Sequence, residues 1–409
     1  MRKLLRRLMR SNRAAAQRAM LAALVGGLFV VGISLATSAT SAQARLAALP
    51  LLAPSPAENQ GSAERVALGR LLFWDPILSG QKDVACATCH HPAFGYSDGL
   101  DLSLGANGIG LGSARVFAEG HPARLVKRNS QSVLNVAFNG LTTDARPSPA
   151  DAPMFWDVRV RSLELQALEP IKALEEMRGN AYGEARAIPA VLARLSANAE
   201  YRRLFERAFA GRQPVSEQNL ARALAAFQRT LVAVNTPFDR YMRGDTTAMS
   251  PEQVRGMERF QSIGCVNCHS GPMFSDFAAH VLAVPDNPKL PESDSGVNTT
   301  YAFRTASLRN LSVTAPYMHN GVFSSLPEVI GFYQRISRGG GRRGGQAARG
   351  VNAQVSRDQI DPLARQLNMR GRGQGELIAF LRALDDPGFD RTVPERVPSG
   401  LPVGGLLEQ

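Results

Sequence analysis

Apolar positions along this chain recur mainly at three- and four-residue spacing, which is the period of an α-helix. The pattern is clearest in residues 191–209 and 218–234. A third segment, residues 250–263, repeats it and opens with Ser250-Pro251-Glu252, a typical helix start with proline at the first helical position. Strand-like alternation of apolar and polar residues is rare. The pattern therefore predicts a mainly α-helical protein.

Three stretches without periodicity are predicted to be loops: glycine-rich residues 99–120, the Pro/Asp/Ser-rich residues 283–300 and the Gly/Arg-rich residues 339–350. The turn Asn235-Thr236-Pro237 is the expected domain junction. We therefore expect an N-terminal domain over 45–235 and a C-terminal domain over 236–409.

The first 44 residues have the pattern of a secretory signal peptide. Residues 1–19 hold seven basic and no acidic side chains, and an apolar run from Met20 to Ala36 follows. Ala42-Gln43-Ala44 is a cleavage signal, so the sequence predicts export to the periplasm. An uncleaved membrane anchor is the alternative, because the apolar run approaches spanning length.

The net charge of the chain indicates no particular class of partner once the leader is excluded. The formal charge of +12 includes the seven leader residues, which leaves +5 on the remaining 365 residues. No basic-aromatic stripe stands out, so a nucleic-acid partner is not expected. No later segment is long and apolar enough to span a bilayer.

All four cysteines lie in two Cys-x-x-Cys-His motifs, Cys86-Ala-Thr-Cys89-His90 and Cys265-Val-Asn-Cys268-His269. Two thiols one helical turn apart can each form a thioether to a porphyrin, and the following histidine can bind the iron. A zinc or dithiol site is the alternative. The histidine after each pair and the wide separation of the pairs favour two covalently bound c-type haems.

Seven phrases in the mature chain, taken in order around these motifs, resemble the bacterial di-haem cytochrome c peroxidase and MauG superfamily. They are Leu68–Pro76, Arg128–Asn135, Phe155–Arg159, Glu169–Met177, Phe227–Leu231, Phe303–Asn310 and Thr314–Gly321. The resemblance implies two cytochrome c-like haem domains packed together. It makes His90 the proximal ligand of a peroxide-reactive haem and His269 that of an electron-relay haem.

The sixth ligand of the second haem distinguishes branches of this superfamily. The peroxidases that accept electrons from a donor use methionine fourteen residues after the histidine of the Pro-Tyr-x-His phrase, whereas MauG-like and MbnH-like members use tyrosine. Counting from His319 reaches Tyr333, which the resemblance therefore makes an iron ligand. From spacing alone Tyr333 reads as a core residue on a helical face with Leu326, Val329 and Ile330. Met318 is a competing ligand.

Other expected site residues follow from the resemblance. Trp156 would carry charge between the haems, although it could also be a core aromatic, as we expect of Trp74. Gln166, Pro170 and Glu176 would line the distal pocket, with Glu176 as the acid/base that moves a proton between the peroxide oxygens. The alternative is that Glu176 is a solvated helix charge.

A calcium ion between the haems is also implied. Its ligands would be Asn129, Thr314 and Pro316, through neutral oxygens that suit this ion; Asn129 could instead cap a turn. In some relatives a histidine caps the resting reactive haem, and His121 is the candidate here, although a solvent-exposed loop position is the alternative.

Three functions follow. The leading hypothesis is an enzyme that reacts with hydrogen peroxide at the His90 haem and, through a high-valent di-haem state, oxidises a partner protein. The second is a cytochrome c peroxidase supplied with electrons by a small periplasmic redox protein. The third is a two-haem electron carrier without enzymatic activity.

Overall fold

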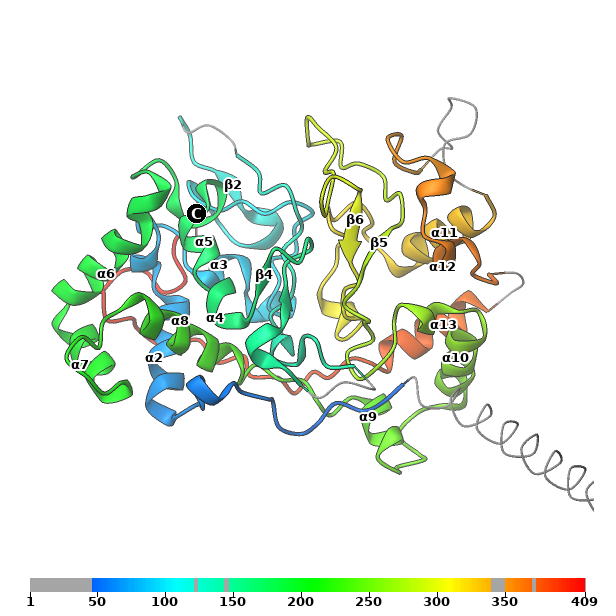
Figure 1. Ribbon diagram of the computed structural model, residues 1–409, viewed down its shortest axis with the longest axis horizontal. Helices are drawn as coiled ribbons and strands as arrows, with labels where there is room; N and C mark the ends of the chain where they lie inside the picture. The colour runs from blue at the N-terminus through cyan, green and yellow to red at the C-terminus, as the bar shows by residue number, and fades with distance from the viewer. Residues whose placement is uncertain (1–45, 121–123, 143–146, 340–349, 370–372, 409) are drawn as a thin grey trace, which may run out of the picture. The chain divides into compact units, whose positions relative to one another are not determined.

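Two pairs of crossing helices organise the chain. The computed structural model describes residues 46–120, 124–142, 147–339, 350–369 and 373–408. Helix α2 (Ala63–Trp74) packs on α8 (Glu217–Gln228), and α10 (Pro251–Ser262) packs on α13 (Gln374–Arg382) (Figure 1).

The two crossings share one residue pattern. A Cβ added to Gly69 would lie 1.9 Å from the carbonyl oxygen of Ala223, and one added to Gly256 would lie 2.0 Å from that of Glu376. Only glycine allows the helix backbones to approach this closely. Four phenylalanines complete the crossings: Phe73 meets Phe227 edge-on with ring centroids 5.2 Å apart, and Phe260 meets Phe380 in a tilted arrangement with centroids 5.3 Å apart. The same packing unit is therefore used twice.

The predicted mainly α class is confirmed. The other α-helices within the described ranges are α3 (Cys86–Cys89), α4 (Leu163–Gln166), α5 (Glu169–Lys172), α6 (Ala187–Ala197), α7 (Ala199–Ala208), α9 (Pro237–Met242), α11 (Leu326–Ser337) and α12 (Pro362–Arg365). Strands within the described ranges form short antiparallel pairs: β1 (Gly108–Ile109) with β2 (Val116–Phe117), β3 (Pro153–Met154) with β4 (Val160–Arg161), and β5 (Ala279–Val281) with β6 (Ala302–Arg304).

The structure confirms one of the three predicted helical segments in full and divides or shortens the other two. The helix expected over 250–263 is α10, and Ser250 caps it together with Gln253. The segment 191–209 is two helices, because Asn198 ends α6 and its side chain accepts the first backbone N–H groups of α7. The segment 218–234 is helical only to Gln228 in α8.

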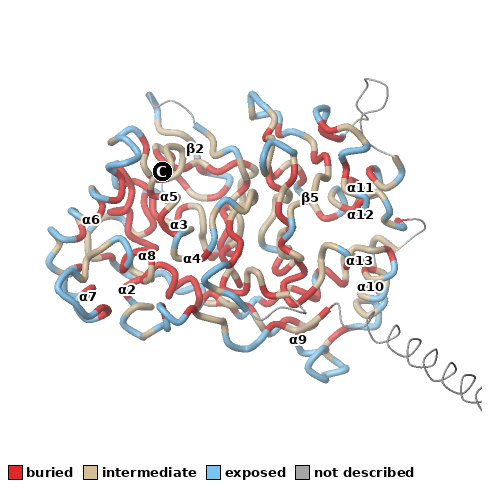
Figure 2. The backbone as a smooth tube through the Cα atoms, viewed as in Figure 1, coloured by how far each residue is buried: buried red, intermediate tan, exposed pale blue. Residues whose placement is uncertain are grey.

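Several hydrophobic clusters form the core of the described residues, and two of them position the site. The first joins α2 to α6, α7 and α8, and Trp74 is fully buried in it, as expected of a core aromatic. Phe389 and Val397, from the C-terminal segment, also pack in this cluster. The second contains Phe332 and Ile336 of α11. Figure 2 shows the buried backbone along α8 and the exposed positions of α7. The domain division at 235/236 stays a prediction.

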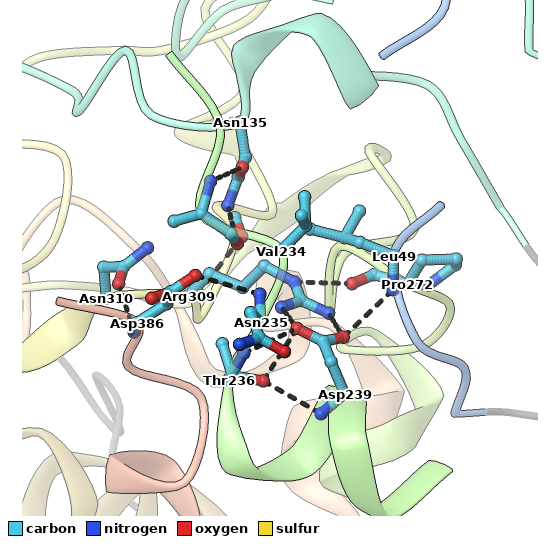
Figure 3. Close-up of polar contacts among 12 residues, drawn as sticks. Leu49, Asn135, Val234, Asn235, Thr236, Asp239, Pro272, Arg309, Asn310 and Asp386 are labelled. Atoms are coloured by element: carbon cyan, nitrogen blue, oxygen red, sulfur yellow. Dashed lines mark hydrogen bonds and ion pairs between the residues drawn. The ribbon is translucent and has the colours of Figure 1, made fainter. Parts of the chain in front are cut away.

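A buried polar network holds the predicted junction turn (Figure 3). The Arg309 guanidinium donates to both carboxylate oxygens of Asp239, each at 2.8 Å. The Thr236 hydroxyl donates to the same carboxylate at 2.7 Å, and the backbone N–H of Asn235 donates to Asp386 at 2.9 Å. Since removing one partner of a buried ion pair leaves the other charge uncompensated, we assign this network a structural role.

Several predictions concern residues outside the described ranges. The leader, residues 1–44, lies there, as do His121 and most of the expected loop at 339–350. Of the helices that the structure describes, none combines the length and apolar character of a membrane-spanning segment.

Candidate active site

A cavity of about 940 Å³ is lined by both Cys-x-x-Cys-His motifs. The first motif is presented by α3, whose four residues place Cys86 and Cys89 one turn apart. The second begins on a short 3₁₀ turn, Cys265–Asn267. None of the four cysteines is used in a disulfide, so all of their sulfurs are available for thioether bonds. The structure thus brings together the attachment residues that the sequence predicted.

Both motif histidines are oriented for metal binding. Nδ1 of His90 lies 3.1 Å from the backbone carbonyl oxygen of Tyr96, and Nδ1 of His269 lies 2.9 Å from that of Phe274. Since a carbonyl can only accept, each Nδ1 carries the proton and each Nε2 keeps a free lone pair. Burial lowers the pKa of His90 to about 4 and also lowers the pKa of His269. Both rings are therefore neutral, as metal-bound imidazole requires.

The cavity wall also holds a buried cation that suits an anionic ligand. Arg304 donates to the backbone carbonyl of Phe155 at 2.8 Å and to the side chain of Gln131 at 3.2 Å, and no carboxylate among the described residues pairs with it. Burial lowers its pKa to about 10. A haem propionate would supply the missing negative charge. The paired thiols, neutral imidazoles and this cation fit covalently attached haem.

The zinc alternative is not supported. Within the described ranges, the one group of side chains close enough to share a metal ion contains a single cysteine, Cys268, together with Asp276 and His280. A structural zinc site built from two Cys-x-x-Cys pairs needs thiolates from both pairs around one ion.

The predicted distal residues line the same cavity, together with the first motif. They are Trp156, Gln166, Pro170 and Glu176. Glu176 lies in a single π-helical turn, Leu174–Arg178, a conformation often found at functional sites. Burial raises the pKa of Glu176 to about 7; Arg159 opposes this shift, and Glu175 adds to it. A carboxyl group with such a pKa can exchange protons near neutral pH.

Gly105 is a site residue that sequence reasoning missed. A Cβ at this position would lie 2.2 Å from the carbonyl oxygen of Glu175 and 2.3 Å from that of Glu176. The neighbouring backbone N–H of Ala106 donates to the Glu176 carbonyl at 2.8 Å. The glycine-rich segment predicted as a loop therefore supports the π-helical turn directly. A second, smaller cavity of about 290 Å³ adjoins Glu176.

Trp156 and the three predicted calcium ligands also line the cavity. The Trp156 indole N–H donates to the backbone carbonyl of Asn129 at 3.0 Å. The Asn129 side-chain nitrogen donates to Leu100, so its Oδ1 is left without a donor among the described residues. The backbone oxygens of Thr314 and Pro316 likewise have no donor there. Three neutral oxygens without donors fit a calcium ion.

Tyr333 and Met318 both line the cavity and pack against the hydrophobic cluster of α11. The pKa of Tyr333 is raised by burial and by the nearby sulfurs of Cys265 and Cys268. Tyr333 is half-buried, and its hydroxyl forms no hydrogen bond within the described residues. The core interpretation of Tyr333 is thus incomplete, because part of its side chain borders the cavity instead of packing in the core.

The comparisons with known proteins agree with this chemistry. Residues 63–247 match the family model of the di-haem cytochrome c peroxidases. Cytochrome-c peroxidase IdrP1 of Pseudomonas sp. strain SCT is 34% identical in an alignment of 393 positions that covers 87% of this chain and 89% of the relative. Methylamine utilization protein MauG of Methylorubrum extorquens is 33% identical in an alignment of 387 positions that covers 90% of this chain and 94% of the relative.

A solved structure also relates this chain to the MauG-like di-haem proteins. A MauG-like protein associated with microbial copper homeostasis superposes with a TM-score of 0.65 at 25% identity, over 83% of this chain and 95% of that one. The hypothesis of an electron carrier without enzymatic activity is therefore set aside. The chain belongs to the di-haem cytochrome c peroxidase family, whose members are oxidoreductases that act on peroxide.

Proposed function

We propose that this protein is a MauG-like enzyme that uses hydrogen peroxide to oxidise a partner protein. The observation that carries the proposal is Tyr333, a tyrosine beside the second attachment motif whose hydroxyl has no partner among the described residues. When bound, the two haems supply redox-active irons, one to react with peroxide and one to hold oxidising equivalents. The surrounding side chains determine which iron reacts with peroxide and which holds the oxidising equivalents.

Peroxide chemistry is assigned to the His90 side of the cavity. His90 offers its Nε2 on one side, and Gln166, Pro170 and Glu176 border the space beside it. The Glu176 carboxylate accepts the proton of the inner peroxide oxygen and returns it to the outer one, which leaves as water. Its pKa of about 7 suits both halves of that transfer. Gly105 holds the backbone that carries this carboxylate.

The second iron is assigned to His269 and Tyr333. A phenolic oxygen is a hard, electron-rich donor that favours oxidised iron, whereas a methionine sulfur raises the potential. Burial disfavours the free tyrosinate, as the raised pKa of Tyr333 indicates, so its negative charge needs a cation at the oxygen. A metal at the Tyr333 oxygen meets that need.

Trp156 is assigned the transfer of charge between the two sites. Its ring lines the cavity, and its N–H is fixed by Asn129, one of the three expected calcium ligands. A calcium ion on Asn129, Thr314 and Pro316 would therefore stiffen the segment that orients the indole. The oxidised partner would be a protein whose tryptophan or tyrosine side chains give up electrons at the surface.

One specific observation favours a second candidate. Met318 also lines the cavity, and a methionine ligand would suit a cytochrome c peroxidase that takes electrons from a small redox protein. The removal of leader 1–44, a periplasmic location and haem domains over 45–235 and 236–409 belong to both candidates. Covalent haem attachment outside the cytoplasm supports the export that they require.

Spectra of the ferric protein test the choice. The proposal expects one high-spin and one low-spin haem by electron paramagnetic resonance, without the near-infrared band of a methionine-bound iron. Tyr333→Phe should change the low-spin signal, and Met318→Leu, the matched control, should leave it as it is. The reverse result, with the near-infrared band present in the parent protein, establishes the peroxidase candidate instead.

A further inference from the structure

His280 was given no role by the sequence, yet it is clamped between two carboxylates beside the second attachment motif. Its Nδ1 lies 2.7 Å from Oδ2 of Asp361, and its Nε2 lies 2.9 Å from Oδ2 of Asp276. An ionised carboxylate can only accept hydrogen bonds, so both ring nitrogens must donate. The ring is therefore an imidazolium, held by two charge-assisted hydrogen bonds.

The backbone fixes both carboxylates in place. The other oxygen of Asp276 accepts the backbone N–H of Ala278 at 3.0 Å, and the other oxygen of Asp361 accepts that of Leu363 at 2.8 Å. Asp361 thereby caps α12. The side chains of His280, Asp276 and Asp361 are only 11%, 23% and 22% exposed. The cluster is thus preorganised and partly shielded from solvent.

The cluster adjoins the sulfur that attaches the second haem. The ligating atoms of Cys268, Asp276 and His280 all lie within 4.8 Å of one another, and His280 lines the haem cavity. A thioether sulfur is neutral, so once Cys268 is bound the cluster holds two negative charges and one positive charge. Asp276, His280 and Asp361 have no part in the peroxide and electron-transfer steps assigned above.

We propose that the Asp276–His280–Asp361 cluster sets the reduction potential of the second haem, with His280 as a positioning residue that offsets the two carboxylates. This inference rests on the proposed two-haem function. Oxidation adds positive charge to a haem, and a net negative group nearby stabilises the oxidised form. The cluster therefore acts in the same direction as Tyr333.

Substitutions that remove a negative or a positive charge from this cluster should shift the reduction potential of the second haem in opposite directions. Asp276→Asn and Asp361→Asn each remove a negative charge and should raise the potential of the second haem. Asparagine keeps the acceptor for Ala278 in the first case and the helix cap in the second. His280→Gln leaves two uncompensated carboxylates and should lower that potential at pH 8, where they stay ionised.

Spectroelectrochemistry on the holoenzyme measures both haems in one sample, so the first haem is an internal control that should not shift. Glu200→Gln breaks a surface ion pair with Arg396 away from the cavity and should move neither potential. Shifts of the same sign in all three variants, or equal shifts at both haems, overturn the proposal.

The outcome is independent of the Tyr333 assignment. If Met318 binds the second iron, the parent spectrum changes but the opposite shifts persist. If the cluster has no electrostatic role, the opposite shifts vanish while the parent spectrum keeps its tyrosine character. Haem content of each variant, measured with pyridine, separates a failed attachment from a changed potential. If His280→Gln does not attach haem, unchanged potentials in both aspartate variants still overturn the proposal.

Discussion

Trp156 and Asn129 are joined by a hydrogen bond of 3.0 Å from the indole N–H to the backbone carbonyl oxygen. Asn129 is itself fixed on two further sides, because its backbone N–H donates to His319 at 2.8 Å and its side-chain nitrogen donates to Leu100 at 2.8 Å. The residue expected to bind calcium therefore orients the residue expected to carry charge. Disturbing the first should disturb the second.

Calcium removal and Asn129→Ala should have the same effect. The variant loses the Oδ1 ligand and the side-chain bond to Leu100, and calcium removal loses the metal. In both cases the backbone carbonyl of residue 129, which accepts the Trp156 indole N–H, is held less firmly. We expect at least a 10-fold loss of calcium affinity in the variant, by analogy with the cost of perturbing metal sites. Oxidation of the protein substrate should slow while the reaction of peroxide with the first haem is retained. A chelator added to the Asn129→Ala variant should slow substrate oxidation no further. A further loss of rate would show that calcium acts through residues other than Asn129.

Tyr333→Phe should abolish oxidation of the protein substrate without preventing haem attachment. Phenylalanine keeps the ring and its packing in α11, and only the hydroxyl is lost. Peroxide consumption with an artificial electron donor should persist, because the His90 site is untouched. Stopped-flow kinetics with peroxide and an assay of substrate oxidation measure the two activities. Native substrate oxidation in the variant would remove Tyr333 from the mechanism.

Peroxide activation should depend on pH through Glu176. The carboxylate form accepts the first proton, so the rate should rise with pH through about 7, the pKa of Glu176, and then level off. Glu176→Gln should lower the rate by about 100-fold or more and flatten the profile. The rate constant for peroxide with the ferric enzyme, followed from pH 5 to 9, is the measurement.

Two neighbours of Glu176 provide matched controls with opposite signs. Glu175 raises the pKa of Glu176, so Glu175→Gln should move the rising limb to lower pH. Arg159 lowers that pKa, so Arg159→Gln should move the limb to higher pH. If the rising part of the pH–rate profile stays at the same pH in both variants, a group other than Glu176 is responsible for it.

Sequence patterns predicted the helical class, which the structure confirms. They also located the two Cys-x-x-Cys-His motifs that line one cavity, because covalent haem attachment requires these residue types at fixed spacing. The helical spacing over 191–209 does not show the break between α6 and α7, since apolar periodicity continues across Asn198 and only its capping bonds reveal the break. The roles of Arg304 and His280 were also missed. Each depends on partners distant in sequence, such as Phe155 for Arg304 and Asp361 for His280, which no local pattern reveals.

The repeated helix crossing was also hidden in the sequence. Gly69 and Gly256 each precede a phenylalanine by four residues, but the flanking residues differ too much for the repeat to stand out. What the two copies share is a contact: each glycine meets the backbone of a partner helix near a second phenylalanine, Phe227 or Phe380. Such a constraint appears only when both helices are seen together.

Gly69→Ala and Gly256→Ala should therefore each destabilise the protein. The added methyl group would lie about 2 Å from a backbone oxygen of the facing helix, which cannot move aside as a flexible side chain would. Overpacking of this kind costs about 1–3 kcal/mol or more. Gly375, in α13, is the matched control, because the nearest atom to its added Cβ is a glutamate oxygen at 4.0 Å. Gly375→Ala should be neutral or slightly stabilising, as alanine is the better helix former. Thermal unfolding of the holoenzyme compares the three, and equal melting temperatures would show that the crossings tolerate a side chain.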